Sequence, residues 1–167
     1  MDLKGSKTEV NLRNAFIGEA MARCRYMYYA EKLREEGKED VAAAYERFAR
    51  NEQEHAKIWF ENFHGIPSTE ENLKESIINE NYESIDMYLS YAKTAQEEGF
   101  DDLAMAFMNV ARIEDGHKKQ FQSLLKETKL NIPNWQCDIC GYIDSENKNP
   151  SICPVCKRNR KNNKYNN

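Results

Sequence analysis

The feature that most constrains this chain is a Glu-x-x-His motif that occurs at Glu52 and His55 and again, 62 residues later, at Glu114 and His117. Residues three apart share one face of a helix, so each motif places a carboxylate beside an imidazole. One copy arises easily by chance in a Glu-rich helix, but these two copies use two of only three histidines. Bundles that bind two metal ions take one such motif from each of two helices and a Glu from each of the other two. The chain is therefore predicted to be an all-α four-helix metal-binding protein.

Helix-forming residues dominate the chain up to about residue 130. Ser6 and Glu9 form a capping-box pattern, and Ser68 and Glu71 form a second. Asp101 is expected to cap the last helix. Apolar residues at helical spacing, with these start signals and the intervening glycines, predict helices over residues 7–36, 39–63, 69–98 and 101–127.

The two predicted helical hairpins repeat one another at an offset of 62 residues. Tyr26 aligns with Tyr88 and Gly37 with Gly99, and the two Glu-x-x-His motifs align as well. This self-similarity indicates an internal duplication.

Three further glutamates could complete a metal site. Glu19 lies among the apolar positions of the first helix, where a carboxylate is costly unless it is paired or bound to a metal; the alternative is that it points to solvent. The strict offset makes Asn81 its counterpart, with Glu80 one residue before and Glu83 two residues after. The second half thus offers two carboxylates where the first offers one, and we expect the two metals to differ in these ligands.

Tyr26 and Tyr88 follow these glutamates at distances that would let each phenol donate a hydrogen bond to a carboxylate. The alternative is that both are core aromatic residues. Cys24 is expected to be a small core residue.

The other four cysteines form two Cys-x-x-Cys pairs, Cys137 with Cys140 and Cys153 with Cys156, separated by twelve residues. Two such pairs around one ion give a tetrahedral four-thiolate site that suits zinc or iron. The helical pattern ends before this region. We therefore expect a helical domain at 1–130, a linker at 131–134 and a small metal domain at 135–167.

Charge and hydropathy exclude other classes. The net charge is -4, and a short basic tail at 157–164 is no nucleic-acid footprint. No signal-peptide core and no apolar run of about 18 residues is present. The expected location is the cytoplasm, where Cys-x-x-Cys pairs favour metal over disulfides.

Over about residues 3–156 the chain resembles the rubrerythrin family, in which a ferritin-like diiron four-helix bundle precedes a rubredoxin-like domain. The resemblance rests on Glu19, Glu80, Glu83, both Glu-x-x-His motifs and the four cysteines with their Cys-Gly-Tyr turn. It implies two irons in a carboxylate-bridged site and one iron, or zinc, in the four-cysteine site. It also implies reduction of hydrogen peroxide to water, with rubredoxin or an NAD(P)H-dependent reductase as electron donor.

The resemblance assigns roles to the ligands. Glu52 and Glu114 would bridge the irons, and one iron would also be bound by Glu80 and His117. Two adjacent ferrous ions can each give one of the two electrons that peroxide cleavage needs. A thiolate-bound iron would return electrons singly.

The other iron would be bound by Glu19 and would exchange Glu83 for His55 on reduction. Tyr26 and Tyr88 match tyrosines that would hydrogen-bond to ligands or to bound peroxide.

Two other functions use some of the same features. A ferroxidase or iron-storage protein of the ferritin type would share the bundle, but it has no use for four cysteines and would form a large hollow shell. A zinc-filled scaffold protein would share the two Cys-x-x-Cys pairs, but it would not need seven metal ligands inside one bundle.

A length argument predicts the assembly. Pairing the two motifs at one ferritin-like site makes the second and third helices parallel, so their link must run back along a helix nearly 40 Å long. The five residues at 64–68 span under about 20 Å. We therefore expect a homodimer that exchanges helix pairs, with Glu19, Glu52 and His55 from one subunit meeting the remaining ligands of its partner.

Overall fold

A computed structural model describes residues 2–126, 136–143 and 150–159. The helical elements are, in order, α1 (Lys7–Glu35), α2 (Glu39–Phe63), α3 (Thr69–Tyr82), the π-helix η1 (Glu83–Met87), α4 (Tyr88–Glu97) and α5 (Asp101–Leu125). The predicted linker at 131–134 lies outside the described residues, as does most of the basic tail. The chain divides into two compact units, residues 1–67 and 68–167. Each unit contains one helical hairpin.

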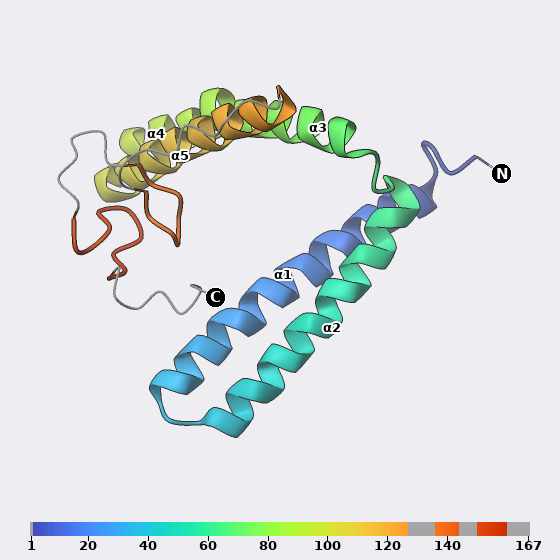
Figure 1. The fold of residues 1–167 in the computed structure, drawn as a ribbon, viewed down its shortest axis with the longest axis horizontal. Coiled ribbons are helices and arrows are strands. Elements are labelled where there is room, and N and C mark those ends of the chain that lie inside the picture. The colour runs from blue at the N-terminus through green and yellow to red at the C-terminus, as the bar shows by residue number, and fades with distance from the viewer. Residues whose placement is uncertain (1, 127–135, 144–149, 160–167) are drawn as a thin grey trace. The chain divides into compact units, whose positions relative to one another are not determined.

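In the first unit α1 packs along α2, and in the second α5 packs along α3, η1 and α4 (Figure 1). The fold is all-α, with four long helices when α3, η1 and α4 are taken as one. The predicted range 39–63 is that of α2. For the other helices the predicted first residues agree with the structure, and the predicted last residues differ from the observed ones by one or two positions. No helix in the described residues is long and apolar enough to cross a membrane.

The helix starts confirm most of the expected capping. Ser68 and Glu71 form a complete capping box. Ser6 accepts a hydrogen bond from the backbone N–H of Glu9, but the Glu9 carboxylate accepts from the N–H of Gly5 instead of Ser6. The half-box still satisfies N–H groups that the helix leaves without partners.

The expectation that Asp101 caps the last helix was wrong. The cap residue is Phe100, which makes no side-chain cap, and Asp101 is the first residue of α5. The backbone closes this turn: Gly99 has φ +83°, and the N–H of Phe100 donates to Ala95 O at 2.7 Å. The left-handed glycine leaves the short turn closed by main-chain groups alone.

Alanine makes up most of the interior of both hairpins, joined in the second by Ile113 and Ser84, so the paired helices lie close together. Buried alanines are Ala22, Ala30, Ala42, Ala49 and Ala56 in the first unit and Ala92, Ala95, Ala104 and Ala111 in the second. Larger apolar side chains, such as Ile17, Met21 and Ile58, are about half exposed. Cys24 is exposed, so its assignment to the core was wrong; the interior positions of the hairpin are taken by alanine.

The duplication is visible in three dimensions. Tyr26 and Tyr29 both pack edge-on against Tyr45, at ring-centroid distances of 5.7 and 5.8 Å. The residues 62 positions later repeat this cluster, because the rings of Tyr88 and Tyr91 lie 6.2 and 5.7 Å from that of Phe107.

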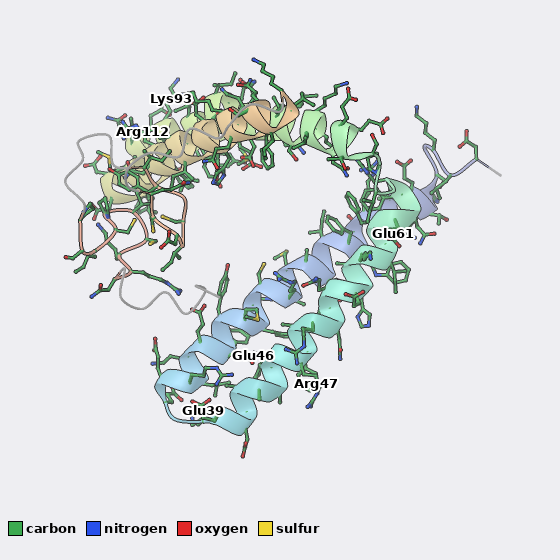
Figure 2. All side chains as sticks on the ribbon, viewed as in Figure 1. Glu39, Glu46, Arg47, Glu61, Lys93 and Arg112 are labelled. Atoms are coloured by element: carbon green, nitrogen blue, oxygen red, sulfur yellow. The ribbon has the colours of Figure 1, made fainter. Side chains whose placement is uncertain are left out.

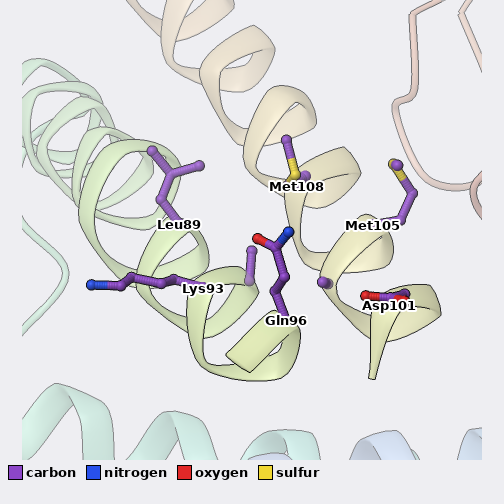
Figure 3. A pocket seen from close by; sticks show the side chains of 8 residues that line it. Leu89, Lys93, Gln96, Asp101, Met105 and Met108 are labelled. Atoms are coloured by element: carbon purple, nitrogen blue, oxygen red, sulfur yellow. The ribbon is translucent and has the colours of Figure 1, made fainter. Parts of the chain in front are cut away.

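The hairpins differ near their turns. In the first, Arg34 bridges Glu39 and Glu46, with 2.7 Å between Arg34 Nη2 and Glu46 Oε1; Figure 2 labels the two glutamates. In the second, Gln96, Asp101 and Met108 hold the equivalent positions and cannot form this ion-pair set. They line a pocket of about 360 Å³ instead (Figure 3).

The two cysteine knuckles are built alike. The N–H of Gly141 donates to Cys137 O at 2.9 Å, and the N–H of Lys157 donates to Cys153 O at 3.0 Å. Both Gly141 and Lys157 have positive φ, +74° and +59°. An isolated antiparallel bridge closes each loop, between Gln136 and Ile143 in the first.

Candidate metal centre

The first half-site lies on α1 and α2. Glu52 and His55 are one turn apart on α2, and Glu52 Oε2 lies 2.8 Å from His55 Nδ1. Glu19 reaches across from α1, with its Oε2 4.0 Å from the same nitrogen. The three side chains offer ligand atoms that all lie within 4.8 Å of one another, so they could hold one metal ion.

The second half-site repeats this arrangement on α3 and α5. Glu114 Oε2 lies 2.7 Å and Glu80 Oε2 lies 3.9 Å from His117 Nδ1. These three residues form the second carboxylate–histidine group within 4.8 Å. Each of its distances agrees within 0.1 Å with its counterpart in the first unit, so the duplication extends to the ligand geometry.

The π-helix η1 explains the one-residue mismatch in the repeat. Glu19 precedes Tyr26 by seven residues, whereas Glu80 precedes Tyr88 by eight. A π-turn takes up an extra residue in a helix, and η1 lies between Glu80 and Tyr88. The structural counterpart of Glu19 is therefore Glu80, and the strict offset to Asn81 gave the wrong partner.

Glu83, the first residue of η1, stands outside the 4.8 Å groups found in the described residues. It nevertheless belongs to the same environment, because burial and the nearby charge of Glu114 raise its pKa. Burial and the charge of Glu83 in turn raise the pKa of Tyr88. Tyr88 thus lies near the carboxylates as expected, and its phenol is also packed against Phe107.

Tyr26 packs against Tyr45 in the first unit. This contact fits the interpretation of Tyr26 as a core aromatic residue. A hydrogen bond from the Tyr26 phenol to a metal ligand stays a prediction.

The donor groups fit a divalent metal. Burial raises the pKa of Glu80, and the charge of Glu114 raises it further, because neighbouring carboxylates repel one another. A cation between them would relieve that repulsion. Nitrogen and oxygen ligands at about 2.1 Å from one ion at right angles lie about 3 Å apart, close to the 2.7 and 2.8 Å pairs found here.

The four cysteines also fit a metal ion. Cys137 Sγ lies 3.8 Å from Cys156 Sγ, and Cys140 Sγ lies 3.6 Å from Cys153 Sγ. Four sulfurs at about 2.3 Å from a tetrahedral centre are about 3.8 Å apart. Burial raises the pKa of Cys140 and Cys153, so a bound cation would be needed to keep all four as thiolates.

The pKa of Cys137 is lowered instead. Burial acts to raise it, but the backbone N–H groups of Cys140 and Ile139 donate to its sulfur and outweigh that effect. Such N–H donors hold a thiolate in place in the loop that binds a metal.

These features define a class: an all-α metalloprotein with two carboxylate–histidine half-sites and one four-thiolate site, as suits an oxidoreductase. Comparison with known proteins identifies the family. The family model for rubrerythrin matches residues 10–125, and that for the rubrerythrin rubredoxin-like domain matches residues 135–162.

The chain is 37% identical over 174 residues to rubrerythrin of Porphyromonas gingivalis, an alignment that covers 92% of this chain and 87% of that protein. It is 36% identical over 178 residues to rubrerythrin-1 of Clostridium acetobutylicum, covering 92% of this chain and 91% of the relative. A solved structure of fully reduced, all-ferrous nigerythrin aligns with a TM-score of 0.44 and 26% identity, covering 95% of this chain and 89% of that one.

The chain belongs to the rubrerythrin family. Its carboxylate–histidine groups and four cysteines are consistent with the cofactors of that family, two irons in the first site and one in the second.

Proposed function

We propose that this protein is a non-haem diiron peroxidase that reduces hydrogen peroxide to water. One observation carries the proposal: the same chain supplies two matched carboxylate–histidine half-sites and a four-thiolate site. Two irons held by the half-sites would supply the two electrons that cleavage of the O–O bond requires. A soft four-sulfur site suits reversible one-electron transfer, which a storage protein does not need.

The ligand roles follow the two half-sites. We propose that Glu52 and Glu114 bridge the two ions, with Glu80 and His117 completing one and Glu19 the other. The matched positions of Glu52 and Glu114, each beside its own histidine, support the bridging role.

Glu83 and His55 would alternate as ligands of the Glu19-bound ion. Two observations support this: Glu83 stands outside the group formed by Glu80, Glu114 and His117, and the His55 side chain is 51% exposed within its own chain. Tyr88, whose pKa is raised, keeps its proton at neutral pH and can donate a hydrogen bond to a ligand or to peroxide. We propose the same role for Tyr26.

Electrons would enter at Cys137, Cys140, Cys153 and Cys156 from rubredoxin or an NAD(P)H-dependent reductase and pass to the diiron site. The reaction would take place in the cytoplasm, where thiolates stay reduced. We place the ferritin-like domain at 1–130 and the rubredoxin-like domain at 135–167.

We further propose that the active form is a homodimer that exchanges helix pairs. The observed end of α2 at Phe63 and start of α3 at Thr69 leave five residues, too few to run back along a 25-residue helix. Large apolar side chains that each unit leaves exposed, such as Met21 and Leu89, would be buried by the partner.

The first test is spectroscopic. Protein isolated in air after production with ample iron should be red, a reductant should bleach it, and one equivalent of hydrogen peroxide per diiron site should restore the colour. Colourless protein with zinc in every site would contradict the peroxidase proposal. A large hollow shell in solution would favour the ferritin-type alternative, a ferroxidase or iron-storage protein.

A further inference from the structure

A lysine links the two helices of the second hairpin beside its half-site. Lys118 of α5 donates a hydrogen bond to the side-chain oxygen of Asn81 in α3, with 3.4 Å between Nζ and Oδ1. Lys118 directly follows His117, and Asn81 directly follows Glu80. The bond therefore joins the chain neighbours of two side chains that are proposed to bind the same metal ion.

The burial of Lys118 distinguishes it from the next residue. Its side chain is 15% exposed, whereas that of Lys119 is 70% exposed. Both lysines form an ion pair with Asp115 at 2.6 Å, so this ion pair does not require burial. Ordering a lysine side chain and removing its ammonium group from water both cost free energy. Of these two described lysines, Lys118 is the one that reaches Asn81.

The internal duplication indicates that the helix pairing does not need a lysine at this position. The residue 62 positions earlier is Ala56, which is buried in the first hairpin. A small apolar side chain therefore takes the equivalent place there. Lys118 is a departure from the repeat, and so is the π-helix η1, which begins two residues after Asn81.

Both departures from the repeat meet at Asn81, which is held at its side chain and at its backbone. Its side-chain oxygen accepts from Lys118, and its carbonyl oxygen accepts at 3.0 Å from the hydroxyl of Ser84, a buried residue of η1. Glu80 precedes Asn81, and Glu83 follows it by two residues. Holding Asn81 against α5 therefore fixes the backbone from which both glutamates project.

The first hairpin has a link of the same kind between α1 and α2. Arg23 Nε donates to Gln53 Oε1 at 2.9 Å. In both hairpins the amide directly follows a glutamate of the half-site, and the cation lies four residues after the glutamate of the other helix. Arg23 and Gln53 are exposed, so water can replace their bond, whereas the bond of Lys118 is partly buried. We therefore expect the link to matter most in the second hairpin.

We propose that Lys118 is a positioning residue for the metal centre: by holding Asn81, it sets the separation of Glu80 from His117 and keeps Glu83 beside them. The 3.9 Å between Glu80 Oε2 and His117 Nδ1 depends on how α3 and α5 are spaced at this level. The proposal rests on the ligand roles given above for a diiron peroxidase, and it names the residue that holds these ligands together.

The first experiment measures metal binding without turnover. Full-length protein with one equivalent of zinc in its four-cysteine site is titrated with cobalt(II), whose visible absorption depends on its coordination geometry. In Lys118→Met the affinity for cobalt should be at least about tenfold weaker than in the wild-type protein, because losing a group that supports a metal ligand costs about 10–100-fold. The cobalt spectrum at saturation should also change, which a loss of stability alone would not cause.

Lys119→Met is the matched control. It removes the same charge and an equal ion pair with Asp115 but leaves the bond to Asn81, so cobalt affinity and spectrum should be those of the wild-type protein. Methionine at position 118 should be tolerated, because the first hairpin has an apolar residue at the equivalent place. Circular dichroism checks that each variant keeps its helices.

A double-mutant cycle tests the contact itself. Asn81→Ala should weaken cobalt binding about as much as Lys118→Met does. The double variant should bind cobalt no more weakly than either single variant, since both substitutions break the same bond. Effects that multiply in the double variant would show that the two residues act independently and would overturn the proposal.

The outcomes separate this proposal from the peroxidase function. If Lys118→Met binds cobalt as Lys119→Met does, the positioning role is refuted and the peroxidase function is not affected. If the wild-type protein binds no cobalt outside its four-cysteine site, the ligand roles are refuted and the positioning role with them. If cobalt binding behaves as expected but the iron-loaded protein does not reduce hydrogen peroxide, the function is refuted while Lys118 is still shown to position the metal ligands.

Discussion

Glu80 illustrates what it costs to gather carboxylates inside a helical protein. Its side chain is 21% exposed, and burial with the neighbouring Glu114 raises its pKa. Such an arrangement disfavours the charged form unless a cation is present. The second half-site is thus suited to a bound cation. We expect the proposed ligands of the two half-sites to contribute unequally to metal binding.

We expect His55→Ala to slow peroxide turnover by at least about tenfold while the protein keeps most of its iron, since losing even a group that supports a ligand costs about 10–100-fold. Glu52→Ala should instead lose most of the diiron content, because a bridging carboxylate neutralises both ions. Metal analysis and initial rates on the same preparations measure the two effects. Full activity in His55→Ala would show that ligand exchange with Glu83 does not occur.

For single residues, the sequence predicted which side chains of a helix lie together, but it did not predict which parts of the chain pack around them. The spacing of Glu52 and His55, and of Glu114 and His117, predicted pairs that the structure brings to within 2.8 Å. The closeness of Gly141 to His117, whose Nε2 would lie 2.7 Å from a Cβ placed on that glycine, was not predicted, because no periodicity links a helix to a distant loop.

At the scale of elements, the π-helix is the feature that the hydrophobic pattern could not reveal. A single π-turn adds one residue to a helix whose apolar positions otherwise repeat about every 3.6 residues. A shift of one residue is too small to be seen in so irregular a pattern of apolar positions. The sequence sign of the π-turn was the position of Glu80, one residue before the counterpart of Glu19 in the 62-residue repeat. Within η1, Ser84 is buried and its hydroxyl donates to Asn81 O at 3.0 Å, which gives that carbonyl a partner.

Deleting Asp86, an exposed residue of η1, should turn residues 69–97 into one regular α-helix. The free energy of unfolding should stay within about 1 kcal/mol of the wild-type value, because both flanking helices keep their packing. Diiron content should fall, because Glu83 turns away from Glu114. Chemical denaturation and metal analysis test both expectations.

The control is deletion of Lys93, an exposed residue in the regular helix α4. This deletion should lower the free energy of unfolding by at least about 3 kcal/mol. Removing one residue rotates the rest of the helix by about 100° and takes side chains out of the interior. If the Asp86 deletion is equally damaging, the π-turn is not an inserted residue. If it leaves the iron content unchanged, the π-turn does not orient Glu83.

At the scale of the whole molecule, the proposed diiron ligands are divided between the two hairpins, three in the first and four in the second. The helix lengths and the five-residue link were predictable, because caps and left-handed glycines mark the helix ends. The pairing of α1 with α2 followed from the short turn between them. Which subunit completes each site does not follow from such local signals, so the helix exchange needs its own test.

Co-expression of Glu52→Ala with Glu114→Ala provides that test. In a dimer that exchanges helix pairs, one site of the heterodimer collects both substituted hairpins and the other collects two intact ones. Purified heterodimers should therefore recover about half of the wild-type activity and diiron content, while either parent homodimer stays inactive. Heterodimers without activity would show that each chain completes its own site.

The alanine-lined hairpins also set the order of events during synthesis. Contacts within α1 and α2 are close in sequence, and helical units of this kind fold in microseconds to milliseconds. The ribosome adds only about 5–20 residues per second, so the first hairpin is complete seconds before Leu125 is made. During that interval a folded first hairpin would already bring Glu19, Glu52 and His55 together on the nascent chain. Newly made chains on one messenger would then meet with their first hairpins already folded, which favours assembly between neighbours during translation.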